Sequence, residues 1–68
     1  MGTILVFPGG LLIEVISNGI TRISGPKGEV EEMLDVFDQY GYEVVPGSCS
    51  VKNDIFSICV LNRSVLRV

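Results

Sequence analysis

The sequence predicts an α+β fold, a small two-layer β-β-β-α-β-β sandwich in which one helix packs on a mainly antiparallel sheet. Short apolar runs rich in Val, Ile and Leu alternate with turns that contain Pro, Gly or Asn, as strands and hairpins do. One segment instead repeats its apolar residues at helical spacing. The length of 68 residues limits the chain to a single domain, which we place at residues 1–68.

Three strands are expected before the helix, at residues 3–7, 11–17 and 20–24. A Pro-Gly-Gly turn at 8–10 separates the first two, because proline presets φ and glycine permits positive φ. Asn-Gly at 18–19 is typical of a type I′ hairpin turn, which requires positive φ at both central positions. The third strand alternates apolar and polar residues, and this alternation predicts a half-exposed edge strand.

The helix is expected at about residues 27–40. Its apolar residues recur three and four positions apart and form one stripe, made of Val30, Met33, Leu34 and Phe37. Pro26 suits a helix start, and Gly41 suits the position that follows a helix end. Acidic residues fill the remaining faces, so we expect the apolar stripe to pack on the sheet and the acidic surface to face solvent.

Two more strands are expected after the helix, at residues 42–51 and 55–62. Pro46 and Gly47 interrupt the first of them, so this strand should be an edge strand or kinked. Residues 64–68 either extend the second strand or begin a short additional one. The sequence leaves two strand orders open. One is β-grasp-like, with the last strand parallel to the first and beside it, and the other is antiparallel throughout.

The residue types exclude several chemistries. The chain has no histidine, so a Ser–His or Cys–His nucleophile pair is impossible, and two cysteines alone cannot complete a standard structural zinc site. Cys49 and Cys59 lie on the two arms of the last hairpin. A three-residue loop would place them opposite each other, and a two-residue loop would offset them. We expect two free thiols, no cofactor and no enzymatic activity.

The charge of the chain limits the classes of partner that we expect it to bind. A net charge of −3 argues against a protein that neutralises nucleic-acid phosphates and against binding to an anionic membrane surface. Residues 1–17 are apolar, but no basic residue precedes them and the turn at 8–10 interrupts them, so neither a secretory signal nor a membrane span is expected. A cytoplasmic protein without a membrane segment is the prediction.

The most informative feature is a surplus of apolar residues. The strand at 55–62 is apolar on both faces, with Phe56, Ile58 and Val60 on one and Ile55, Cys59 and Leu61 on the other. One helix covers one face, and monomers rarely leave a large apolar face exposed. We therefore predict a homo-oligomer, with a dimer favoured, whose interface contains Leu12, Ile16, Ile55, Cys59 and Leu61. A sheet that bends and closes on itself, or a different protein partner, would also cover this face.

The expected function follows from these features. We predict a small non-enzymatic, self-associating protein-interaction module. One version is a regulatory or inhibitory protein that presents an acidic helix face, made of Glu31, Asp35 and Asp38, to a basic protein partner.

Two alternatives to an interaction module are retained. The first is a nucleic-acid-binding protein, which the overall acidity disfavours; its residues would be Lys52, Arg63, Arg67, Tyr40 and Tyr42. The second is a ligand-binding or enzymatic protein with its site at an oligomer interface. Its single candidate carboxylate, on Glu14, is better explained as an exposed side chain or as an ion-pair partner of Arg22 across the Asn-Gly hairpin.

Overall fold

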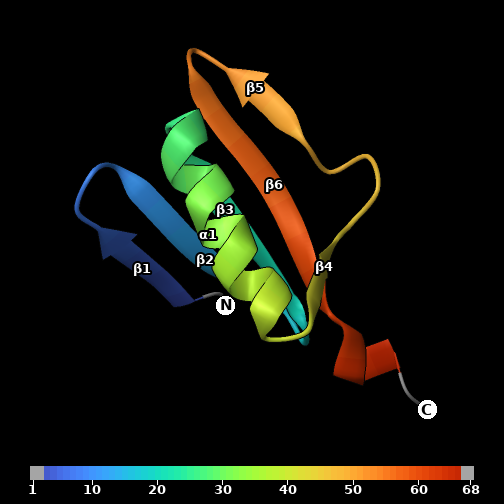
Figure 1. Ribbon diagram of the computed structural model, residues 1–68. Helices are drawn as coiled ribbons and strands as arrows, with labels where there is room; N and C mark the ends of the chain where they lie inside the picture. The colour runs from blue at the N-terminus through green and yellow to red at the C-terminus, as the bar shows by residue number, and fades with distance from the viewer. Residues whose placement is uncertain (1–2, 67–68) are drawn as a thin grey trace.

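The computed structural model describes residues 3–66, and one helix packs there on a six-stranded sheet (Figure 1). In chain order the elements are β1 (Thr3–Phe7), β2 (Leu11–Ser17), β3 (Ile20–Gly25), α1 (Lys27–Gln39), β4 (Tyr42–Val44), β5 (Ser50–Lys52), β6 (Ile55–Asn62) and the 3-10 helix η1 (Arg63–Leu66). Every strand pair is antiparallel, and the order is β1-β2-β3-β6-β4, with β5 also paired to β6. The predicted α+β class is confirmed. The β-grasp-like order is wrong, because β6 lies between β3 and β4 rather than beside β1.

The third strand is central, and its prediction as an edge strand is wrong. β3 pairs with β2 on one side and with β6 on the other. Its alternation has a different cause: Thr21 and Ile23 are buried under α1, whereas Arg22 points to the opposite, uncovered face. An alternating pattern reports how many faces of a strand are covered, and it does not report how many neighbours the strand has.

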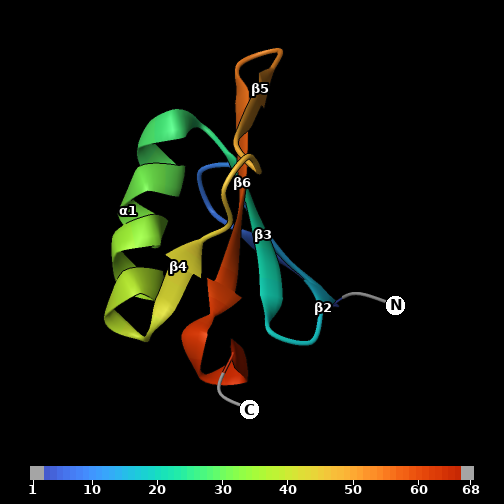
Figure 2. The same ribbon diagram turned by 90° about the vertical axis from the view of Figure 1, so that its right-hand side faces the viewer.

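The core lies between α1 and the middle of the sheet, and Figure 2 shows the helix standing on one side of the strands. It consists of Leu11, Ile13, Ile23, Val30, Ile58 and Val60, with Met33, Leu34, Phe37, Tyr42 and Phe56 packed against it. The predicted helical stripe is therefore confirmed, and Phe56, Ile58 and Val60, predicted to share one face of β6, lie on its helix side. α1 packs mainly on β3, β4 and β6, so its cover does not extend across the whole sheet.

A glycine is required at the end of β3, which lies against the turn between β1 and β2. Gly25 has φ of +149°, and a Cβ placed on it would lie 2.8 Å from the Gly10 carbonyl oxygen and 3.2 Å from Leu11 Cα. A side chain at this position would collide with backbone rather than with a movable side chain. Pro26 follows as the N-cap of α1, so this contact fixes the β1–β2 turn against the start of the helix.

The segment predicted as one strand at 42–51 consists of two short strands on the same side of β6. β4 and β5 contain three residues each, and the chain leaves the sheet between them, at Pro46 and Gly47. The Ser48 side chain takes the place of backbone hydrogen bonds that are missing at this break. Its Oγ accepts a hydrogen bond from the Cys59 N–H (3.1 Å) and donates one to the Val45 carbonyl (2.7 Å). The predicted interrupted edge strand is confirmed.

The loop length of the last hairpin decides whether Cys49 and Cys59 lie opposite each other. Lys52 pairs with Ile55, so the loop has two residues, and both Asn53 and Asp54 have positive φ, as a type I′ turn requires. This register offsets Cys49 from Cys59, and both thiols are free. Cys49 is exposed and Cys59 is half-buried.

The chain after β6 does not continue as a strand up to Leu66. Residues 63–66 form η1, and the Asn62 side-chain oxygen accepts hydrogen bonds from the Ser64 N–H (3.0 Å) and hydroxyl (2.8 Å). Such a local turn competes with extended pairing. The prediction of an extended or additional strand at 64–68 is therefore wrong for its described part, and residues 67 and 68 lie outside the described residues. Within the described chain, α1 is too short and too polar to cross a membrane.

Candidate protein interface

The face of the sheet opposite α1, called here the open face, carries a shallow hollow of about 400 Å³. Cross-strand pairing places Leu12 beside Ser24 and Ser24 beside Ser57, so side chains from neighbouring strands meet across the sheet. The lining residues are Ile4, Leu12, Glu14, Arg22, Ser24, Ser50, Lys52, Ile55 and Ser57. The hollow is therefore polar at its middle, aliphatic toward β1 and mixed toward β5, where Ser50 and Lys52 lie beside Ile55.

Its polar middle is internally satisfied. Arg22 donates a hydrogen bond to Glu14 within a salt bridge across β2 and β3, and the hydroxyls of Ser24 and Ser57 lie 3.1 Å apart. The hydrogen bond from Arg22 to Glu14, together with the charge of Glu14, raises the pKa of the Arg22 guanidinium. This is the ion pair that the sequence offered as one explanation of Glu14. The pair leaves neither an unmatched charge nor a free carboxylate there.

The hairpin of β1 and β2, residues 3–17, is called here the wing because it projects beyond α1 (Figure 1). All five residues of β1 are exposed, including Ile4 and Val6 on the open face and Leu5 and Phe7 on the helix side. β2 adds Leu12, Val15 and Ile16 to the exposed large hydrophobic residues. The wing is thus apolar on both faces, and neither face of β1 is covered.

The predicted interface residues do not form one cluster. Leu12 and Ile55 are exposed and line the same hollow. Cys59 and Leu61 are half-buried farther along the open face of β6. Ile16 lies where a bulge between Val15 and Ser17 shifts the β2–β3 register, so it does not follow the alternation that grouped it with Leu12.

The predicted interface did not include the residues of β1, all of which are exposed. Their signal was present: TILVF is an apolar run without a charge, beside a strand that is itself apolar on both faces. Its exposure depends on where α1 lies across the sheet, and the sequence did not indicate that placement.

The acidic helix face is exposed as expected. Glu31, Asp35 and Asp38 are all accessible on α1, and among the residues described none of them forms a salt bridge. These three side chains are available to a partner, and they lie on the far side of the molecule from the open face.

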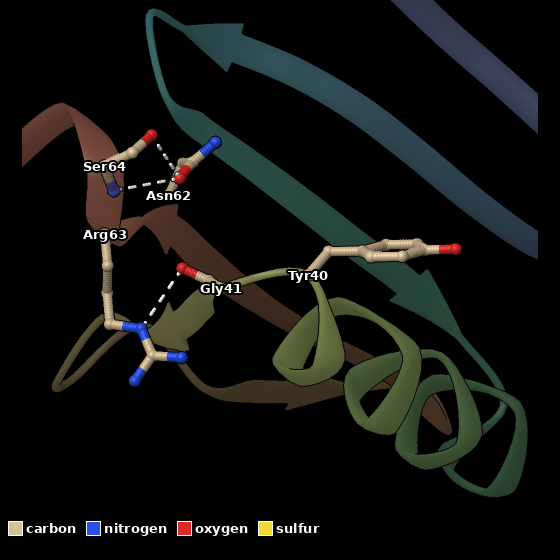
Figure 3. A pocket seen from close by; sticks show the side chains of 5 residues that line it. All are labelled: Tyr40, Gly41, Asn62, Arg63 and Ser64. Carbon is tan, nitrogen blue, oxygen red and sulfur yellow. Dashed lines mark hydrogen bonds between the residues drawn. The ribbon is translucent and has the colours of Figure 1, made fainter.

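The residues proposed for nucleic-acid binding are not gathered. A second hollow of about 540 Å³ is lined by Tyr40, Gly41, Asn62, Arg63 and Ser64 (Figure 3). There the Arg63 Nε donates a hydrogen bond to the Gly41 carbonyl (3.2 Å), and the Tyr40 ring points away from Arg63. Tyr42 packs edge-on against Phe37, with ring centroids 4.9 Å apart, and is not free to stack on a base.

Lys52 lies at the other end of β6, where it pairs with Ile55, and Arg67 lies outside the described residues. Among the described residues of this set, Tyr40 and Arg63 line one hollow, whereas Lys52 lines the other. Over residues 3–66, no group of three His, Cys, Asp or Glu side chains is placed to hold a metal ion. Comparison with protein-family models, with curated protein sequences and with solved structures finds no significant match to this chain.

Proposed function

We propose that the protein is a small non-enzymatic, self-associating interaction module, and that the wing is the surface through which two copies meet. The observation that supports this most directly is the exposure of β1 on both faces along its whole length. β1 is the outer strand of the sheet, and an apolar strand that lacks cover on both faces gains most from a partner.

Electrostatics also favour a second copy at the wing. Glu14 is the sole charged residue of residues 3–17, and its salt bridge with Arg22 neutralises it. The other acidic residues, which give the chain its net charge of −3, lie outside the wing. Two wings can therefore meet without bringing like charges together, whereas two acidic helix faces would repel.

The self-association is tested with one pair of matched substitutions. Val6 on β1 and Val51 on β5 lie on opposite edges of the sheet and are 74% and 66% exposed. We expect Val6→Glu to convert a concentration-dependent dimer into a monomer, because it places a charge in the apolar contact, and Val51→Glu to leave the dimer intact. Light scattering coupled to size-exclusion chromatography measures the mass. A wild-type protein that stays monomeric at millimolar concentration contradicts the proposal.

The acidic helix supports a second candidate function, the binding of a basic protein partner. Its support is the exposure of Glu31, Asp35 and Asp38 without a salt bridge in the described chain. Conversion of all three to Lys should abolish binding of a labelled oligolysine peptide, followed by fluorescence anisotropy.

A matched charge control separates the helix face from net charge. The same conversion at Glu29, Glu32 and Glu43 changes the net charge equally and should reduce binding much less. Equal losses in the two triple variants would assign the attraction to net charge and reject a recognition face.

A further inference from the structure

We infer that β1 of a second copy occupies the free edge of β1, in an antiparallel pair that joins the two sheets into one. This inference rests on the self-association proposed above and specifies its geometry. β1 is the end strand of the sheet, and in residues 3–66 no strand pairs with its outer side. Its outward backbone N–H and C=O groups can therefore form a ladder with another strand.

The two edges of the sheet differ in how they resist such pairing. The β4–β5 edge is divided into two three-residue strands, Pro46 and Gly47 leave the sheet between them, and Ser48 bonds to the backbone there. Broken, short and charged strands are the usual means of preventing edge-to-edge association. The β1 edge has five consecutive paired residues with no proline, no bulge and no charge, so one edge is protected and the other is open.

Self-pairing of β1 has a favourable register. When all five residues pair about a two-fold axis, Leu5 lies opposite Leu5 of the other copy, Ile4 opposite Val6, and Thr3 opposite Phe7. Each pair keeps its members on one face, since opposed residues in an antiparallel ladder share a face. Ile4 and Val6 then cover each other on the open face, while on the helix side Leu5 covers Leu5 and Phe7 packs beside Thr3.

The same geometry keeps the acidic helices apart. Both copies of α1 lie on the same face of the joined sheet, and the two β3 strands are separated by five strand spacings, about 24 Å. That distance exceeds the Debye length of about 8 Å at physiological ionic strength, so repulsion between the two helices is screened. The dimer therefore leaves both acidic surfaces free for another partner.

Disulfide trapping tests the register. Leu5→Cys is made in a Cys49→Ser background, which removes the exposed native thiol. Directly opposed residues have Cα atoms about 4.5–5.5 Å apart, within the range of a disulfide. Leu12→Cys in the same background is the matched control, because Leu12 is 41% exposed and Leu5 is 51% exposed. In the edge-paired dimer, the two copies of Leu12 lie about 14 Å apart or more.

With oxidised glutathione, we expect Leu5→Cys to form a linked dimer at least about tenfold faster than Leu12→Cys, because Leu12 lies beyond disulfide reach. Mass spectrometry assigns the linkage by identifying a cross-linked peptide that contains position 5 of both copies. A wild-type dimer with faster linkage at Leu12→Cys would indicate face-to-face packing, and it would overturn this inference while leaving self-association in place. A wild-type monomer would overturn both.

Hydrogen exchange on the wild-type chain provides the second measurement, independent of any substitution. Edge pairing should slow exchange of amides in residues 3–7 as protein concentration rises, since new ladder bonds protect them. Protection that rises with concentration on other elements but not in residues 3–7 would contradict the edge-paired dimer.

Discussion

β1 and the helix-covered strands of the sheet are built from similar residues but have opposite environments. In β3 and β6, Ile23, Ile58 and Val60 are buried, whereas the aliphatic residues of β1 are all exposed. The difference arises from dimensions. A helix is about 10 Å wide and strands lie about 4.8 Å apart, so one helix covers two or three strands. α1 covers the middle of the sheet and leaves both faces of β1 exposed.

The largest expected effect tests this comparison directly. Ile23→Ala should lower the free energy of unfolding by about 2–5 kcal/mol, because it removes a fully buried side chain beneath α1. Leu5→Ala should cost less than about 1 kcal/mol in the monomer, since a half-exposed side chain leaves no cavity. Urea unfolding at low protein concentration measures both. Similar losses for the two variants would show that the wing is already packed in the monomer.

A smaller effect is expected where the two regions join. Gly25→Ala should destabilise the fold by about 1–3 kcal/mol, because its Cβ meets the Gly10 carbonyl oxygen at 2.8 Å and φ is +149°. Gly28→Ala is the control, since nothing lies near an added Cβ there. Thermal unfolding compares the two variants. A Gly25→Ala variant as stable as the wild type would mean that the β1–β2 turn moves freely against the start of α1.

The smallest effect is expected at the β4–β5 edge, which is protected against pairing with another strand. Ser48→Ala should cost about 1 kcal/mol, because the half-buried Cys59 N–H loses its hydrogen-bond acceptor at the break between β4 and β5. Faster hydrogen exchange at Cys59 should accompany the loss. Ser50→Ala serves as the control, because Ser50 is exposed on β5. Unchanged exchange at Cys59 would show that the serine is not needed to close this edge.

Much of the fold was predictable because the sequence signals were local. Turn residues bounded the strands, helical spacing located α1, and alternation placed Ile58 and Val60 on one face of β6. Strand order was not predictable, because the place of β6 between β3 and β4 depends on pairing between distant segments. For the same reason β3 was misassigned as an edge.

The candidate interface was predicted in part. Leu12 and Ile55 share the open face because alternation is preserved along β2 and β6 up to the bulge. Ile16 does not follow the alternation of β2 because the bulge interrupts it, and no residue type at 15–17 indicates a bulge. β1 was omitted because its exposure follows from the position of α1 across the sheet, which is a property of the assembled fold.

The central position of β6 has a consequence for how the chain folds. Among the described strands β6 is the last to be synthesised, yet it supplies Ile58 and Val60 to the core and pairs with β3, β4 and β5. A nascent chain that ends at β5 has the helix but lacks one of the three strands on which the helix mainly packs. Pairing of Ile23 with Ile58 closes a long loop, and such contacts are slow to form. We therefore expect the core to be completed only after β6 has been synthesised.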